Sequence, residues 1–91
     1  MGLLKRSTES KQLAVIARAP FKVYYEGPAQ ALSAANLIGQ FDILPGHADF
    51  FSILIPGEVS IDTGSSAPVS FSINNGIVAV RDDEVMLFCN M

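Results

Sequence analysis

The side chains best suited to chemistry in this sequence are a single histidine, a single cysteine and several carboxylates. His47 and Cys89 are the only residues of their kinds, so the chain cannot supply a zinc site made of several His or Cys ligands. The sequence also contains no phosphate-cradling glycine loop and no serine nucleophile motif. We therefore predict no metal site, no cofactor and no catalytic residue.

The carboxylates leave acid–base catalysis open as an alternative, but their positions favour another role. Asp82, Asp83 and Glu84 are consecutive, and a charge cluster of this kind usually lies in a solvated turn. The other candidates are spread along the chain: Asp49, Glu58 and Asp62. We interpret the chain as a non-enzyme.

Cys89 offers two interpretations, a small buried hydrophobe or a reactive thiol. A reactive thiol needs a lowered pKa, which a helix start or a cationic cluster would provide. Neither lies nearby in the sequence. We therefore predict that Cys89 is buried.

The composition describes one small domain with a surface for a partner. The chain has 91 residues, of which 49% are hydrophobic and 16% are charged. This length fits one compact core, and so little charge leaves apolar side chains on the surface. We predict a flexible tail over residues 1–12 and one domain over residues 13–91.

The charge and the apolar runs exclude several partners. A net charge of −3 argues against nucleic acid, because modules that bind phosphate backbones carry basic stripes. No apolar run reaches the 18 or so residues that a membrane span needs, and the start of the chain lacks the apolar centre of a secretory signal. We expect membrane contact only through a complex.

Short apolar runs alternate with turn residues from Leu13 onward, which is typical of an all-β fold. Residues 69–73 alternate strictly, placing Val69, Phe71 and Ile73 on one face and two serines on the other. Residues 59–62 alternate in the same way, so we predict that these two runs form an antiparallel hairpin. The pattern predicts a flattened antiparallel β-sandwich or barrel of about eight to ten short strands.

Two runs, residues 50–55 and 85–89, are almost continuously apolar. Such runs are typical of strands that are covered on both faces, so we predict that they form the central layer. The predicted core residues are Ile53, Leu54, Phe71, Ile73, Val85 and Leu87. Residues 29–35 are alanine-rich and have helix propensity, but neighbouring runs need pairing partners, and we predict a strand there.

The most informative segment is residues 39–48, which contains the string Ile-Leu-Pro-Gly-His. Pro45 fixes φ, and Gly46 can adopt the positive φ that a type II turn requires at its third position. His47 then lies at the exit of the turn. Taken alone, the triplet is common, and a histidine bonded to a local backbone group is the structural alternative.

The order of the motifs resembles the ATP synthase epsilon family. The resemblance covers about residues 13–89, and the Ile-Leu-Pro-Gly-His string is its most specific part. Asn75 stands where the family carries a second glycine, a mild change because asparagine tolerates positive φ. The matching segments are residues 20–27, 39–47, 56–57 and 75–77.

Other positions depart from the family pattern. Ile38 and Gln40 replace acidic residues, Asp42 replaces a glycine, and Ile55 replaces a lysine. Most of these exchanges make the predicted surface more apolar, which fits either an altered partner interface or drift. Many members of the family continue into a helical hairpin that can brake rotation, whereas the printed sequence stops at Met91, so those activities are not carried over.

The resemblance implies a non-catalytic rotor subunit that joins the gamma shaft to the membrane c-ring and helps couple ion flow to ATP synthesis. It implies ring-side contacts at Gln40, Asp42 and His47. It also implies gamma-side contacts at Ile77 and Val78, for which ordinary core packing is the alternative. The implied location is peripheral, on the cytoplasmic face of the inner or plasma membrane, or on the matrix or stroma side in an organelle. A free-standing β-sandwich interaction module is the alternative function.

Overall fold

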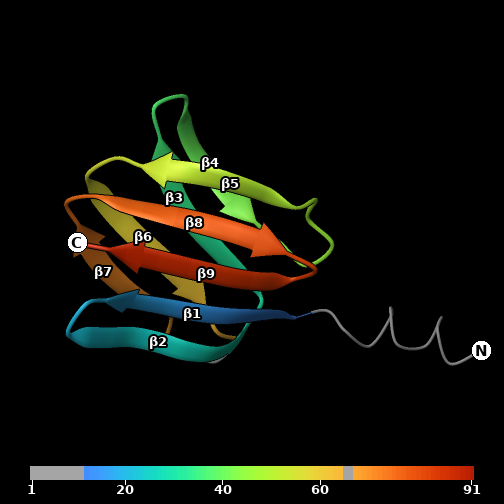
Figure 1. The fold of residues 1–91 in the computed structure, drawn as a ribbon. Helices are drawn as coiled ribbons and strands as arrows, with labels where there is room; N and C mark the ends of the chain where they lie inside the picture. Colours follow the sequence, from blue (N-terminus) through green and yellow to red (C-terminus); the bar gives the residue numbers. More distant parts are fainter. Residues whose placement is uncertain (1–11, 65–66) are drawn as a thin grey trace, which may run out of the picture.

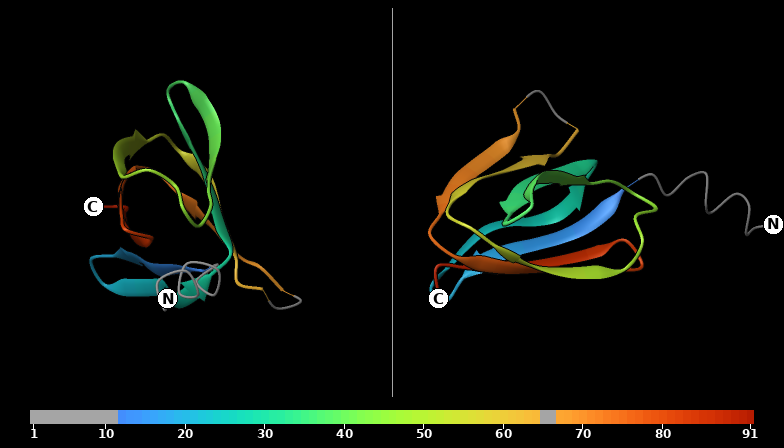
Figure 2. Two further views of the ribbon diagram at one scale, coloured as in Figure 1. Left: turned by 90° about the vertical axis from the view of Figure 1, so that its right-hand side faces the viewer. Right: turned by 90° about the horizontal axis from the view of Figure 1, so that it is seen from above.

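The computed structural model describes residues 12–64 and 67–91, which form two β-sheets packed face to face (Figures 1 and 2). Sheet A has the strand order β2-β1-β9-β8-β5, and sheet B has the order β4-β3-β6-β7. The predicted all-β sandwich is confirmed. Within the described residues the strands are β1 Leu13–Ala19, β2 Lys22–Ala29, β3 Ala31–Asn36, β4 Gly39–Ile43, β5 Phe50–Leu54, β6 Gly57–Asp62, β7 Val69–Ile73, β8 Gly76–Arg81 and β9 Glu84–Cys89.

One strand pair departs from the predicted antiparallel arrangement. β1 pairs in parallel with β9, and Ile16 lies beside Met86 in this register. The other described pairs are antiparallel. The first and last strands therefore meet inside sheet A, where no local turn signal could reveal their pairing.

The core is formed by the inward-facing residues of both sheets, as the two-residue period of a strand requires. Leu54, Ile73, Val85 and Leu87 are buried as predicted, and Phe71 is half-buried against the core. The prediction for Ile53 is wrong, because its side chain is 68% exposed.

The run at residues 50–55 is also not a central strand. β5 is an edge strand of sheet A, and its outward-facing Phe51 is 62% exposed. β9 does lie in the middle of sheet A, but its outward-facing Met86 is 45% exposed. These continuous apolar runs mark strands whose second face is apolar and uncovered in the described residues.

The alanine-rich segment is a strand, as predicted against its helix propensity. β3 contributes the buried Leu32 and Ala34. Leu32 lies beside Ile43 of β4 on one side and Ile61 of β6 on the other. Pairing on both sides and core burial outweigh the local preference.

The predicted hairpin of residues 59–62 and 69–73 is confirmed by the pairing of β6 with β7. The turn between β7 and β8 differs from its sequence interpretation, because neither Asn75 nor Gly76 has a positive φ. Gly76 is required for space instead: a Cβ atom there would lie 3.0 Å from the carbonyl oxygen of Phe88.

A backbone hydrogen bond and an aromatic contact close the sandwich along two opposite edges. At one edge, the Ile55 N–H donates to the Ala35 carbonyl at 3.1 Å. At the other edge, the ring of Tyr24 on β2 stacks on Phe71 of β7 with 4.2 Å between centroids. The two sheets are therefore held as one body.

The tail predicted for residues 1–12 lies outside the described residues except for Gln12, which is exposed. Between Gln12 and Met91, the described part of the chain contains no helix long and apolar enough to cross a membrane.

Candidate functional site

The edge where β4 and β5 meet carries the segment that the sequence singled out. We define the β4–β5 edge as residues 36–55. Its outermost point is the hairpin tip between β3 and β4, which projects from the body in Figure 1. Leu37 and Ile38 at this tip are 91% and 96% exposed, although large aliphatic side chains are usually buried.

The tip is held in shape by its own hydrogen bonds. The Asn36 Oδ1 atom accepts bonds from the N–H groups of Ile38 at 2.9 Å and Gly39 at 3.2 Å. The Asn36 Nδ2 atom donates to Ser52 Oγ on β5 at 3.0 Å. An asparagine that bonds the backbone two residues ahead is a common turn-forming device. The two aliphatic side chains are thus presented by an ordered turn.

Gln40 and Asp42 lie on the same outward face of β4, and both are exposed. Asp42 accepts a hydrogen bond of 2.7 Å from Ser33 Oγ on the neighbouring strand, with which it is paired in register. Gln40 lies opposite Ala35, closer to the tip. Two of the predicted ring-side residues therefore share one surface.

His47 lies at the far end of the same edge, after the Pro45–Gly46 turn. The predicted turn is confirmed: Gly46 has a φ of 86°, and the His47 N–H donates to the Leu44 carbonyl at 3.0 Å. The His47 Nδ1 atom lies 2.7 Å from the Ala48 carbonyl oxygen, and the ring packs on Phe50 with centroids 4.8 Å apart. This contact agrees with the alternative interpretation of His47 as a histidine that bonds a local backbone group.

A reciprocal pair of hydrogen bonds ties this turn to sheet A. The Gly46 N–H donates to Asp83 Oδ1 at 2.8 Å, and the Asp82 N–H donates to Asp49 Oδ1 at 3.0 Å. Asp82 and Asp83 form the β8–β9 turn and both have positive φ, as in a type I′ hairpin turn. From the sequence, Asp82 and Asp83 are interpreted as part of a solvated charge cluster; in the structure the Asp83 carboxylate anchors a loop, and Asp82 contributes its backbone N–H.

The outer face of sheet A carries a contiguous set of apolar side chains. Cross-strand pairs place Ile53 beside Ile77 and Ile77 beside Phe88 in one row. The neighbouring row runs through Phe51, Ala79, Met86 and Ile16. Contiguous apolar patches of this kind mark interaction surfaces.

The two predicted gamma-side residues fall on opposite sides of sheet A. Ile77 is half-buried and belongs to the apolar outer face. Val78 is fully buried in the core. This burial agrees with the alternative interpretation of Val78 as a core residue, and it leaves no surface of Val78 for a partner to contact. Sequence reasoning missed Phe51 and Met86 because it treated their runs as covered on both faces.

The outer face of sheet B differs in character. Its side chains are small, polar or acidic, and they include Ser33, Glu58, Ser60, Asp62, Ser70 and Ser72. It resembles an ordinary solvated face.

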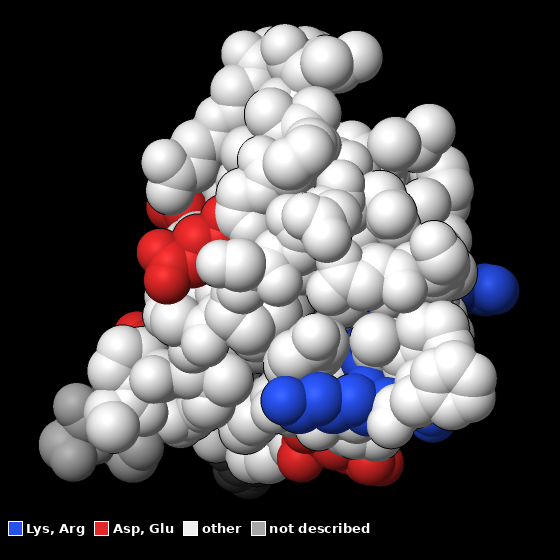
Figure 3. All heavy atoms as spheres, turned by 90° about the vertical axis from the view of Figure 1, so that its left-hand side faces the viewer, with Lys and Arg blue, Asp and Glu red and all other residues white. Residues whose placement is uncertain are grey.

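Viewed from the end of the molecule nearest the C-terminus, the projecting β3–β4 hairpin and most of the surface below it are uncharged (Figure 3).

The reactive side chains do not form a chemical centre within the described residues. Residues 12–64 and 67–91 contain no group of three or more His, Cys, Asp or Glu side chains that could hold a metal ion. Cys89 is fully buried, as predicted, and desolvation by burial raises the pKa of its thiol. A raised pKa disfavours the reactive thiolate.

Comparisons with known proteins agree on one family. Residues 12–91 match the model of the ATP synthase delta/epsilon chain β-sandwich domain. The ATP synthase epsilon chain of Ruminococcus albus is 36% identical over 67 residues, which cover 74% of this chain and 49% of that protein. The epsilon chain of Clostridium novyi is 28% identical over 71 residues, covering 78% and 54%. The chain spans about half the length of these curated relatives.

Solved structures share the fold. A chain in the mitochondrial ATP synthase of Euglena gracilis, in an assembly of OSCP, F1 and c-ring, aligns with a TM-score of 0.81 at 18% identity, covering 89% of this chain and 52% of that one. A chain in the central stalk and c-ring structure of the Tetrahymena thermophila enzyme aligns with a TM-score of 0.74 at 20% identity, covering 85% and 62%.

Proposed function

This chain belongs to the ATP synthase delta/epsilon chain family, whose β-sandwich domain it matches over residues 12–91, and we propose that it is a non-catalytic central-stalk subunit of an F-type ATP synthase. Its role is to join the gamma shaft to the membrane c-ring and so to help couple ion flow to ATP synthesis. It is a peripheral part of the membrane-bound complex, on the cytoplasmic face or on the matrix or stroma side in an organelle. The family match across the whole sandwich is the observation that carries the proposal.

The outer face of sheet A is the proposed gamma-binding surface. It presents a contiguous set of aliphatic and aromatic side chains, with Ile77 near its middle and Phe51 and Ile53 on the edge strand. Burying such side chains against a partner removes apolar surface from water, which favours association. The polar outer face of sheet B offers no comparable gain.

The β4–β5 edge is the proposed ring-side surface, with Gln40, Asp42 and His47 as polar contacts and the Leu37–Ile38 tip as an apolar one. These residues all belong to one stretch of chain that runs along this edge. β4 rises about 3.3 Å for each residue, so the tip and the His47 turn contact the ring at two separate points.

The two proposed surfaces are mechanically linked. The hydrogen bonds of Asp83 and Asp49 connect the His47 turn to the β8–β9 hairpin, whose strands carry much of the outer face of sheet A. Packed β-sandwich interiors deform little. Force applied at the ring-side edge therefore passes through these bonds and the core to the gamma-binding face, without any chemical step in this subunit.

A calorimetric titration against purified gamma subunit tests the proposal. We expect a one-to-one complex that is lost in Ile77→Arg, while Ser72→Arg, an exposed change on the outer face of sheet B, leaves it intact. An Ile77→Arg variant that folds and binds as tightly as wild type would show that gamma does not use this face.

The ring-side surface needs a separate test. Gln40→Arg combined with His47→Ala should weaken recovery of c-ring in a pull-down of the assembled rotor, because both side chains lie on the proposed contact edge. Unchanged recovery would remove these residues from the ring contact and leave the gamma assignment unaffected.

A further inference from the structure

A shallow groove lies on the outer face of sheet A, at the end where β1 begins. Its volume is about 340 Å³. Ala14 and Gly27 leave it open because their side chains are small or absent, and Ile16 and Met86 form an apolar wall. The full lining is Ala14, Val15, Ile16, Glu26, Gly27, Glu84, Val85 and Met86.

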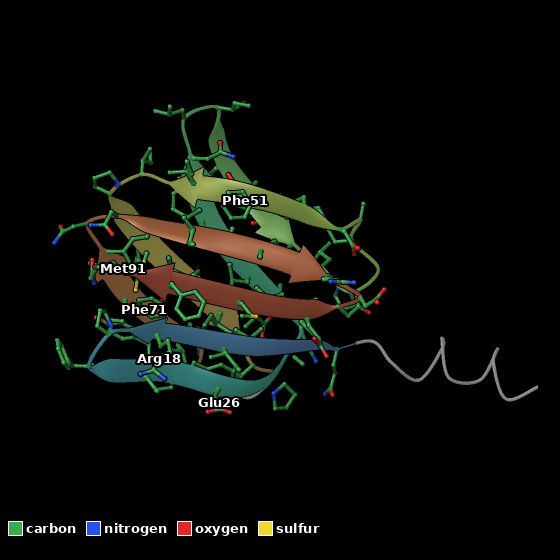
Figure 4. The ribbon with its side chains drawn as sticks, in the orientation of Figure 1. Arg18, Glu26, Phe51, Phe71 and Met91 are labelled. Carbon is green, nitrogen blue, oxygen red and sulfur yellow. The ribbon has the colours of Figure 1, made fainter. Side chains whose placement is uncertain are left out.

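Two carboxylates border this apolar groove, Glu26 on β2 and Glu84 on β9. Both are exposed, and neither takes part in an ion pair or hydrogen bond within the described residues. Arg18 lies further along β1, where its guanidinium group bonds the carbonyl oxygens of Ala19 and Pro20. Figure 4 shows Arg18 and Glu26 on neighbouring strands of sheet A.

We propose that this groove receives a lysine or arginine side chain of the gamma-type partner that covers the outer face of sheet A. This inference rests on the proposed function and adds the chemistry of the contact. The long stem of such a side chain lies on apolar surface while its charged head stays near carboxylates. The apolar wall and the two acids of the groove match both parts. Arg81 lies opposite Glu84 in the β8–β9 register but forms no ion pair with it in the described residues.

The position of the groove favours a partner protein as the occupant. Ile16 and Met86 belong both to the groove and to the apolar row that continues to Phe51, so a protein seated on that row also passes over the groove. Glu26 lies opposite Ile16 and Glu84 lies opposite Ala14, on the two strands that flank β1. These two strands are about 10 Å apart. A side chain lying along β1 therefore has a carboxylate on each side.

Binding kinetics with purified gamma test this inference. The double variant E26Q/E84Q should bind about five-fold more weakly than wild type, mostly through slower association, and its affinity should depend less on salt. Glu58→Gln, which removes an exposed carboxylate from the outer face of sheet B, is the matched control and should bind as wild type does.

Each outcome separates the possibilities. Wild-type affinity and salt dependence in E26Q/E84Q would overturn the groove assignment and leave the proposed function intact, whereas absence of gamma binding by wild type would overturn both. The N-terminal segment supplies the alternative occupant, because it carries Lys5, Arg6 and Lys11. The E26Q/E84Q change should therefore also be made in a K5A/R6A/K11A background. If it still weakens gamma binding there, the partner supplies the cation. If it no longer weakens gamma binding, the inference is overturned in favour of the N-terminal segment.

Discussion

Leu87 and Ile53 are aliphatic residues in strands of the same sheet, and the sequence predicted both as core. The structure separates them: Leu87 faces sheet B and is fully buried, whereas Ile53 faces outward. The sequence pattern could not distinguish the two positions because residues on both faces of these strands are apolar. Only the packing of sheet A against sheet B decides which face is covered.

Truncating these two residues should give opposite results. Leu87→Ala should lower the free energy of unfolding by about 2–5 kcal/mol, because it removes buried methyl groups and leaves a cavity. Ile53→Ala should change it by less than about 1 kcal/mol, because the lost methyl groups are mostly in water already. Urea denaturation of both variants checks this. Equal losses would mean that the outer face of sheet A is covered in solution, for example by a second copy.

Cys89 gives the stability of the domain a defined pH dependence. Burial raises the pKa of its thiol above the ordinary value of 9.0, so above that value the thiol of the unfolded chain ionises before that of the folded chain. The contribution to stability is complete below the ordinary thiol pKa and is lost as pH rises through the raised folded-state value.

The unfolding free energy of wild type should therefore fall more steeply between neutral and alkaline pH than that of Cys89→Ala. Comparing the slopes of the two proteins isolates the thiol from the lysines and tyrosines that titrate in the same range. Parallel slopes would show that the thiol does not become harder to ionise on folding.

The turn at Pro45–Gly46 shows how far local sequence determines a structural element. Proline followed by glycine predicted the turn type, and the positive φ of Gly46 agrees. The hydrogen bonds from this turn to the β8–β9 hairpin were not predictable, because Gly46 and Asp83 are 37 residues apart. β3 shows the opposite case, since its helix propensity was overridden by pairing with β4 and β6.

A pair of glycine variants tests the role of the turn. No atom lies within 4 Å of a Cβ added at Gly46 or at Gly57, but only Gly46 has a positive φ. Gly46→Ala should therefore cost about 1–2 kcal/mol through backbone strain alone, whereas Gly57→Ala should stay within about 0.5 kcal/mol of wild type. Thermal unfolding of both variants provides the measurement, and equal melting temperatures would exclude the strain.

At the scale of the whole molecule, β9 is the central strand of sheet A. It pairs with β1 in parallel and with β8 antiparallel, so it connects the two ends of the chain. The edge strand β5 pairs only with β8 within sheet A. Opening of β9 requires the loss of its hydrogen-bonded pairing with two strands, whereas β5 can open by losing its pairing with β8 alone.

Amide hydrogen exchange should reflect this order. Backbone amides bonded within β9, such as those of Val85 and Leu87, should exchange only through global unfolding, and bonded amides of β5 should exchange faster through local opening. Exchange followed by NMR under native conditions measures both sets. Equal protection of β5 and β9 would mean that sheet A opens only as a unit.

The sequence by itself determined the all-β class, the positions of most strands, the Pro45–Gly46 turn and the family resemblance. Each of these depends on neighbouring residues, through the two-residue alternation of a strand, the fixed φ of proline or a contiguous motif. The tertiary structure alone decided the parallel pairing of β1 with β9, the exposure of Phe51 and Ile53, the burial of Val78 and the groove between Glu26 and Glu84. These features join residues that are distant in the chain, and which face of an apolar strand is covered depends on the second sheet that packs against it.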